Sequence, residues 1–216
     1  MDQGKDGLTI TQKLLTSIEI IPFGVGENQA EAWQPKIIER DGIRIALIGA
    51  SYADYNDNWT QNSNQVARMQ HTEKLQRSLQ NARSKADFVV VMMHAGAEYT
   101  REPTQLQKDF AHSAIDAGAD MVFGAHPHWT QGIESYRGKY IFYSLGNFVF
   151  DQEFSPETKT GLAVEVWLSK QSGVTKLTQT RLHPILIENY WQPRLLVGGE
   201  KIKALQEIQQ KTDILE

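Results

Sequence analysis

Two histidines separated by one proline, His126 and His128, have the types and spacing most suited to chemistry in this sequence. Side chains at positions i and i+2 point to the same side of an extended backbone, and Pro127 favours that extended form in the residue before it. Two imidazole nitrogens could then reach one small cation or a close pair. The alternative is a surface turn that happens to hold two histidines, and the spacing alone does not decide between them.

A third histidine, His94, stands in a related position. It follows the continuous apolar run of residues 87–93, which is typical of a central strand covered on both faces. A helix predicted over residues 103–117 leads to the next apolar run, residues 120–124, and His126 leaves the carboxyl end of that run. Sheets of α/β proteins bind ligands just beyond the carboxyl ends of their strands. The co-location of three imidazoles at one sheet edge therefore favours a metal site.

A catalytic histidine that works without a metal is a further alternative. It would require a nearby serine or aspartate, and Ser144 and Asp151 are available. Nothing in their spacing selects them. Zero cysteines exclude thiolate zinc sites and cysteine nucleophiles, so a metal would be held by His, Asp, Glu, Asn or water. Neutral imidazole suits Zn, Mn or Fe.

Composition narrows the class of protein. The 216 residues are 40% hydrophobic, which is enough for one globular domain with a real core. A net charge of -4, without a block of Lys and Arg, argues against a nucleic-acid-binding protein. No apolar run of about 18 residues is present, and no basic and apolar leader follows Met1. The chain as written is expected to be soluble, with no membrane segment.

The amino-terminal part of the chain is predicted to form the elements that precede these histidines. An amphipathic helix with Asp6 as N-cap is predicted first, and a two-residue hairpin turn is predicted at Asp41-Gly42. The apolar residues of the helix fall mostly at helical spacing: Leu8, Ile10, Leu14, Leu15 and Ile18. The predicted elements are a helix over residues 6–19 and a buried strand over 20–26. A hairpin with strands over 35–40 and 43–49 follows, and then a long polar loop over 51–66.

The remaining elements alternate between helix and strand and then become antiparallel. A helix is predicted with His71 in its first turn facing solvent, and Pro103 is expected at the first position of the helix that follows His94. His183 precedes Pro184 at a strand edge and is expected to be structural or exposed. The predicted ranges are a helix over 69–86, a hairpin over 132–136 and 139–145, strands over 161–169, 174–183 and 185–190, and an amphipathic helix over 200–212.

Three segments of the chain carry a family resemblance. Residues 94–99 (HAGAEY), 124–128 (GAHPH) and 143–148 (YSLGNF) resemble the CapA-type poly-γ-glutamate capsule synthesis family, which is similar to the calcineurin-like metallophosphoesterases. The match extends over most of the chain up to Asp151 and is looser beyond it. The resemblance implies one domain over residues 1–216, with its core motifs in 87–151. It also implies a four-layer αββα sandwich of two mixed sheets flanked by helices.

The resemblance also implies roles for individual residues. His94 would be an isolated metal ligand, and His126 and His128 a terminal pair, around one divalent ion (Mn, Zn or Fe) or two. Glu98 and Asn147 match further family positions and are candidates for substrate binding. The alternative for Ser144 and Asn147 is a turn held by side-chain hydrogen bonds.

The sequence departs from the family pattern at its front. Residues 2–4 (DQG) resemble an Asp-x-Gly motif that follows an Asn-His pair in the family, so the early ligands would lie upstream of Met1. The chain is therefore expected to be the carboxyl-terminal part of such a domain. By the same resemblance, the intact parent would be extracytoplasmic and anchored to a membrane.

Three functional hypotheses follow. The first is a metal-dependent hydrolase of the phosphoesterase type that serves capsule biosynthesis. The second is a non-catalytic accessory protein that uses the same scaffold to bind an anionic polymer or other proteins of capsule synthesis or export. The third is a fragment with no activity of its own.

Overall fold

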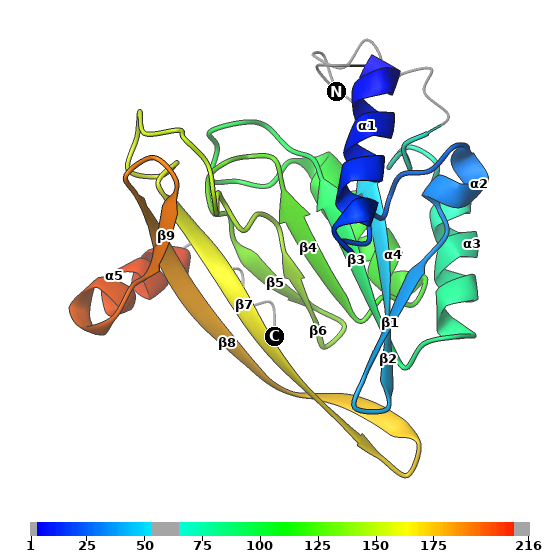
Figure 1. Cartoon of the computed structure of the whole chain (residues 1–216). Coiled ribbons are helices and arrows are strands. Elements are labelled where there is room, and N and C mark those ends of the chain that lie inside the picture. The colour runs from blue at the N-terminus through cyan, green and yellow to red at the C-terminus, as the bar shows by residue number, and fades with distance from the viewer. Residues whose placement is uncertain (1–3, 53–64, 210–216) are drawn as a thin grey trace.

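The fold consists of two β-sheets and five helices within residues 4–52 and 65–209, which a computed structural model of the chain describes. Figure 1 shows a broad first sheet beside a long, narrow second sheet. The strands of the first sheet are, in spatial order, β1 Lys36–Arg40, β2 Ile43–Ser51, β3 Phe88–His94, β4 Met121–Ala125, β6 Lys139–Phe142 and β5 Ile133–Tyr136. Those of the second are β7 Thr160–Gln171, β8 Val174–Glu188 and β9 Gln192–Leu195. The helices are α1 Gly4–Ser17, α2 Gln29–Ala32, α3 Thr72–Arg83, α4 Gln105–Asp116 and α5 Gly198–Gln209.

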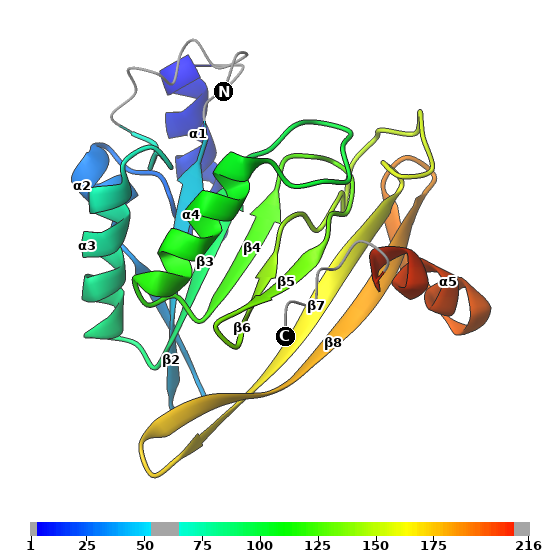
Figure 2. The same cartoon turned by 180° about the vertical axis from the view of Figure 1, so that it is seen from behind.

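The first sheet is mixed. Its central strands β2, β3, β4 and β6 run parallel, and β1 and β5 pair antiparallel at the edges. The strand predicted over residues 87–93 is confirmed as β3, whose Val89 and Val91 are fully buried. Helices α3 and α4 cover one face of this sheet (Figure 2). Leu79 of α3 and Ala114 of α4 are fully buried there, so each helix presents an apolar face to this sheet.

The second sheet packs against the other face of the first. Phe88, Met121 and Phe142 of the first sheet form one apolar cluster with Leu162 of β7 and Ile208 of α5. Two packed sheets flanked by helices confirm the fold class expected from the resemblance. In the described residues the second sheet is purely antiparallel, whereas the resemblance implied two mixed sheets.

Two hairpin turns predicted from the sequence are confirmed. Asp41 and Gly42 have φ of 50° and 73°, and Arg137 and Gly138 have φ of 51° and 72°. Positive φ at both central residues is typical of the type I′ turn, whose twist matches that of the flanking strands. The turns therefore fix the register of β1 with β2 and of β5 with β6.

The strand predicted over residues 20–26 is wrong. Within that segment only Val25 forms an isolated bridge, to Val66. Gly24 has φ of 76°, which lies outside the extended region, and a Cβ at this position would lie 3.0 Å from the backbone of Gly49. The chain therefore bends at Gly24 and passes close to β2 instead of running on as a strand.

The first predicted helix forms, but its burial differs from expectation. α1 begins at Gly4, so Asp6 lies inside the helix and is not its N-cap. No residue of α1 is buried, and Ile10, Leu14 and the following Ile18 are 56%, 62% and 65% exposed. The apolar stripe of this helix therefore faces solvent in the described structure.

The segment between β2 and β3 is described only in part. The loop predicted over residues 51–66 lies largely outside the described residues, and β2 runs as far as Ser51. The helix predicted over 69–86 forms as the shorter α3. His71 precedes it and is exposed, as predicted, with Nδ1 3.2 Å from Oε1 of Gln29.

The strand break predicted at Pro184 is wrong, because β8 continues through this residue. The carbonyl of Pro184 accepts from the amide of Leu196, just beyond the end of β9. In an antiparallel strand the N–H and C=O of one residue point to the same neighbour. The missing N–H of Pro184 therefore falls where β9 has ended, and the pairing of Pro184 with Leu162 of β7 is retained.

The last strand and helix also differ from the prediction. The third strand of the second sheet is β9, which the sequence patterns did not indicate, while residues 185–188 belong to β8. α5 buries Ile208 and leaves Ile202 59% exposed. Within the described residues no helix is both long and apolar enough to span a bilayer.

Candidate functional site

The predicted histidines meet at the carboxyl edge of the first sheet. His94 is the last residue of β3 and lies in register with Ala125 at the end of β4. The amide of Ala95 donates to the carbonyl of Ala125, which keeps the two strand ends together. The ring centroids of His94 and His126 are 4.9 Å apart, and those of His126 and His128 are 6.3 Å apart. We call this group of three histidines the imidazole edge.

The backbone of the His-Pro-His segment is a turn, so the extended form predicted for it is wrong. His126 has φ of 107° and His128 has φ of 61°. Positive φ is unfavourable for residues with a side chain, and it persists only where surrounding contacts fix it. One such contact is the hydrogen bond from the amide of Tyr99 to the carbonyl of Pro127. The turn, rather than an i and i+2 alternation, sets the positions of the two rings.

His128 is oriented by Asn147. Nδ1 of His128 lies 2.8 Å from Oδ1 of Asn147, whose Nδ2 donates to the carbonyl of Thr158 at 2.9 Å and to Oε1 of Gln152 at 3.3 Å. The amide nitrogen is thus assigned as the donor and Oδ1 as an acceptor, so Nδ1 of His128 carries the proton. Nε2 of His128 is then left with its lone pair, and Oε1 of Glu98 is 3.9 Å from it.

Aromatic side chains border His128. Tyr99 stacks on its ring at a centroid distance of 5.7 Å, and Phe150 approaches at 5.1 Å. Phe154 meets Tyr99 edge to face at 5.2 Å, and Nε2 of Gln152 donates to the Tyr99 hydroxyl at 3.1 Å. These rings restrict the orientation of His128 and exclude water from one side of it.

The other two candidates that the sequence singled out have different positions. Ser144 is 2% exposed, and its Oγ accepts from the amide of Gly146 at 3.2 Å, which is a turn contact. Gly146 has φ of 69°. Asp151 is exposed on the segment after Phe150. The turn interpretation thus fits Ser144, while Asn147 links the loop to His128.

Sequence reasoning missed two glutamines beneath the site. Gln107 of α4 is fully buried, and its Nε2 donates to Oε1 of Gln131 at 3.0 Å. Nε2 of Gln131 donates to the carbonyls of Thr100 and Glu102. A Cβ at Gly96 would lie 2.6 Å from Oε1 of Gln107. The pair therefore ties the loop that follows His94 to the chain that follows His128.

The position of Gln107 on α4 also corrects the predicted helix start. Thr104 is the N-cap: its Oγ1 accepts from the amide of Gln107, and Oε1 of Gln107 accepts from the amide of Thr104 at 2.9 Å. Pro103 therefore precedes the N-cap instead of occupying the first helical position. The pattern T-x-x-Q in the sequence was the available signal for this capping box.

The edge supplies part of what a metal site requires. A histidine that donates one ring N–H to an amide or carboxylate and presents the other nitrogen is typical of metal ligands, and His128 has this arrangement. In the described part of the chain, no three His, Asp or Glu side chains are close enough together to hold one metal ion. The donors present fit imidazole-binding ions, and these residues alone do not complete a site.

Comparison with known proteins identifies relatives. A family model described as bacterial capsule synthesis protein PGA_cap matches residues 1–152. The chain is 32% identical to the PGA biosynthesis protein CapA of Bacillus subtilis over 185 residues, which is 85% of this chain and 48% of that protein. It is 28% identical over 164 residues to a Mycobacterium tuberculosis protein described as a polyglutamine synthesis accessory protein, covering 71% of this chain and 43% of that protein. The chain thus spans about half the length of these relatives.

Solved structures share the fold. A Staphylococcus aureus protein described as a 5′-nucleotidase, determined with alpha-ketoglutarate, matches with a TM-score of 0.50 at 15% identity. The match covers 88% of this chain and 36% of that one. At this identity the likeness concerns the fold alone.

Proposed function

Because the chain belongs to the PGA_cap family of bacterial capsule synthesis proteins, we propose that it serves poly-γ-glutamate capsule synthesis through its imidazole edge. The reaction proposed for this edge is metal-dependent hydrolysis of the phosphoesterase type, with His94, His126 and His128 as ligands of a divalent ion such as Mn, Zn or Fe. The observation that carries the proposal is the hydrogen bond from His128 to Asn147, which leaves the lone pair of Nε2 to bind a metal ion.

The residues of the edge would have separate tasks. Asn147 fixes the tautomer and ring plane of His128, and the neighbouring Tyr99 ring limits rotation away from the site. Glu98 lies close enough to accept a proton from water held near Nε2 of His128. A bound divalent ion would supply Lewis acidity toward an ester oxygen. The His94 and His126 rings already lie side by side, with their centroids 4.9 Å apart.

Metal titration of the 216-residue chain tests the edge directly. Calorimetry with Mn²⁺ or Zn²⁺ should detect binding that His128→Ala weakens by at least about tenfold, and Asn147→Leu by about 10- to 100-fold, because removal of an orienting partner costs that much in other metal sites. His183→Ala is the matched control, since His183 pairs with Glu165 on the second sheet. Equal affinity in the His128→Ala and His183→Ala variants would contradict the proposal. Circular dichroism melts establish that each variant is folded.

Hydrolysis is tested separately from binding. With the metal present, the 216-residue chain is expected to cleave an aryl phosphate or a bis-aryl phosphodiester only weakly, because its described residues do not complete a metal site, and His128→Ala should abolish this turnover. Turnover that survives in His128→Ala would place the chemistry elsewhere. The phosphate esters are generic probes, because the proposal concerns the reaction class.

A second candidate function is a non-catalytic accessory role, in which the edge binds an anionic polymer or other capsule-synthesis proteins. The description of the Mycobacterium tuberculosis relative as an accessory protein favours it. It predicts that the chain binds metal and poly-γ-glutamate but turns over neither phosphate ester. The two candidates thus differ in turnover and agree on the His128 dependence of metal binding.

A further inference from the structure

A cavity of about 530 Å³ lies between α5 and the second sheet, and none of the residues that line it belongs to the imidazole edge. Figure 1 shows α5 lying beside the end of the sheet that carries β9. Its apolar floor is formed by Ile185 of β8, Leu196 after β9 and Ile208 of α5, which are 1%, 9% and 6% exposed. This volume is within the range of pockets that hold small organic ligands, and an apolar floor with few polar groups is their usual composition.

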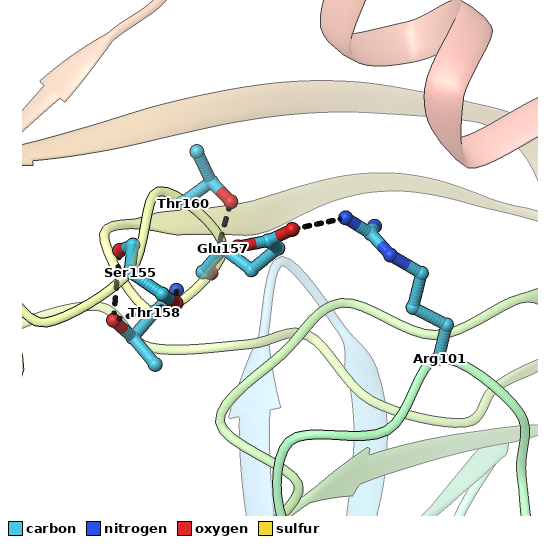
Figure 3. A network of polar contacts seen from close by, with 5 residues as sticks. All are labelled: Arg101, Ser155, Glu157, Thr158 and Thr160. Carbon is cyan, nitrogen blue, oxygen red and sulfur yellow. Dashed lines mark hydrogen bonds and ion pairs between the residues drawn. The ribbon is translucent and has the colours of Figure 1, made fainter.

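Charged groups surround this floor. At one end Nη2 of Arg101 donates to Oε1 of Glu157 at 2.7 Å (Figure 3). Along α5, residues Glu200, Lys203 and Glu207 all line the cavity, because positions i, i+3 and i+7 share one helical face. The sides of the cavity therefore present both signs of charge around an apolar base.

The charges differ in how far they are already neutralised. Glu157 is paired with Arg101, and Glu200 is paired with Arg194 at 3.0 Å. Among the described residues, no ion pair joins Lys203 or Glu207 to another side chain. The Arg101 guanidinium has more N–H donors than its bond to Glu157 uses. A cationic group and an anionic group on α5 are thus available, with further donors at the Arg101 end.

The separation of the two available charges indicates the length of a matching ligand. Lys203 and Glu207 are four residues apart on the helix, which corresponds to about 6 Å of rise. In a single amino acid the ammonium and carboxylate are attached to one carbon. In a dipeptide they are separated by one further residue, whose extended length is about 3.5 Å. The spacing on α5 therefore suits a short peptide better than a single amino acid.

We propose that this cavity binds a short zwitterionic peptide with aliphatic side chains. Its carboxylate would meet Lys203 and Arg101, its ammonium would meet Glu207, and its side chains would cover the apolar floor. A fatty carboxylate would leave Glu207 without a partner, and an alkylamine would leave Lys203 without one. A polyanion would face the carboxylate of Glu207, which lowers its affinity. The site shares no lining residue with the imidazole edge, and the proposal goes beyond the proposed capsule function.

Binding by the full chain tests the ligand class. Calorimetry in EDTA, which separates the result from any metal at the imidazole edge, would use L-leucyl-L-leucine and two capped analogues. N-acetyl-L-leucyl-L-leucine lacks the ammonium, and L-leucyl-L-leucine amide lacks the carboxylate. We expect saturable binding of the free dipeptide, with each capped analogue roughly fivefold weaker, as for loss of one partly exposed ion pair. Failure of the free dipeptide to bind, or equal binding of all three, would overturn the proposal.

Variants then locate the site. Ala204→Trp places a large ring in the cavity and should abolish binding, whereas Gln206→Trp, which faces away from it, should not. Glu207→Gln should remove the discrimination against the acetylated dipeptide while leaving the exposed helix surface intact. Binding that survives Ala204→Trp would overturn the assignment to this cavity. If Ala204→Trp does not fold, the Glu207→Gln result decides: unchanged discrimination against the acetylated dipeptide refutes the proposed contact.

Discussion

The sequence predicts a helix at both α1 and α4, yet their positions in the fold are opposite. α4 buries its inward face against the first sheet, including Phe110 and Ile115, and α1 buries no residue. The side of α1 that lines a groove with the rest of the chain is polar: Lys5, Thr9, Gln12, Lys13 and Thr16. Periodicity thus predicts that a helix forms. Burial of its apolar stripe requires a complementary surface, which periodicity does not specify.

The two helices also differ in their contacts with the imidazole edge. α4 connects β3 to β4, and through Gln107 it contacts the segments that follow His94 and His128. Gln131 extends this contact to the backbone of the loop at Thr100. α1 has no such link to the imidazole edge among the described hydrogen bonds. Changes on α4 should therefore affect both stability and the edge, and changes on α1 should affect neither.

The largest effect is expected from Ile115→Ala on α4, matched by Ile10→Ala on α1. Ile115 is 4% exposed, and truncation of a buried isoleucine lowers the free energy of unfolding by about 2–5 kcal/mol. Ile10 is 56% exposed, so its truncation should change this free energy by less than about 0.5 kcal/mol. Urea unfolding followed by circular dichroism measures both. Similar losses in the two variants would contradict the contrast between the helices.

The second largest loss of stability is expected from Gln107→Leu, matched by Gln105→Leu on the same helix. Leucine at 107 leaves the buried Oε1 of Gln131 and the amide of Thr104 without their hydrogen-bond partners. Each lost hydrogen bond should lower the free energy of unfolding by at most about 1–3 kcal/mol. Gln105 is exposed, and within the described part of the chain its side chain bonds only Asp109 on the next turn, so its replacement should cost a few tenths of a kcal/mol.

The same pair of variants separates a structural role from a role at the edge. If Gln107 positions the loops around His128, Gln107→Leu should also weaken metal binding in the calorimetric titration, measured at a temperature where the variant is fully folded. Gln105→Leu should bind metal as the unchanged chain does. Full metal affinity in folded Gln107→Leu would confine this glutamine to a purely structural role.

The third largest loss of stability is expected from Thr104→Ala, which removes the N-cap side chain of α4. Its hydroxyl satisfies an amide of the first helical turn, so the loss should be about 1 kcal/mol. The comparison is Thr16→Ala on α1, whose hydroxyl bonds the carbonyl of Gln12 inside the helix and caps nothing. Thermal unfolding should show a lower midpoint for Thr104→Ala and almost no change for Thr16→Ala. Equal midpoints in the two variants would mean that the cap contributes little.

Local signals predicted most of the first sheet. The apolar runs ending at His94 and before His126 gave the correct strands, because strands covered on both faces are apolar at every position. The turns at Asp41-Gly42 and Arg137-Gly138 were correct because each has a glycine at its second central position, where positive φ has no steric cost. These features depend on neighbouring residues alone, so they could be derived from the sequence.

Features set by distant parts of the chain could not be derived in this way. Whether Pro184 breaks β8 depends on where β9 ends, and the bend at Gly24 depends on the approach of Gly49. The sequence predicted which three histidines meet at the imidazole edge. It did not predict the geometry of the edge. The positive φ of His126 and the role of Asn147 toward His128 arise from contacts between segments well separated in sequence.

The smallest effect is expected from replacing the apolar stripe of α1 itself, with Ile10→Gln, Leu14→Gln and Ile18→Gln combined. Each of these side chains is more than half exposed, so the exchange removes less buried apolar area than at a core position, and glutamine has a good helix propensity. The free energy of unfolding should change by less than about 0.5 kcal/mol for each exchange. Leu79→Gln on α3 is the matched control, because Leu79 is fully buried and an amide there should cost several-fold more. A loss in the triple variant close to that of Leu79→Gln would show that the stripe is covered in the folded chain, which would remove the contrast between α1 and α4.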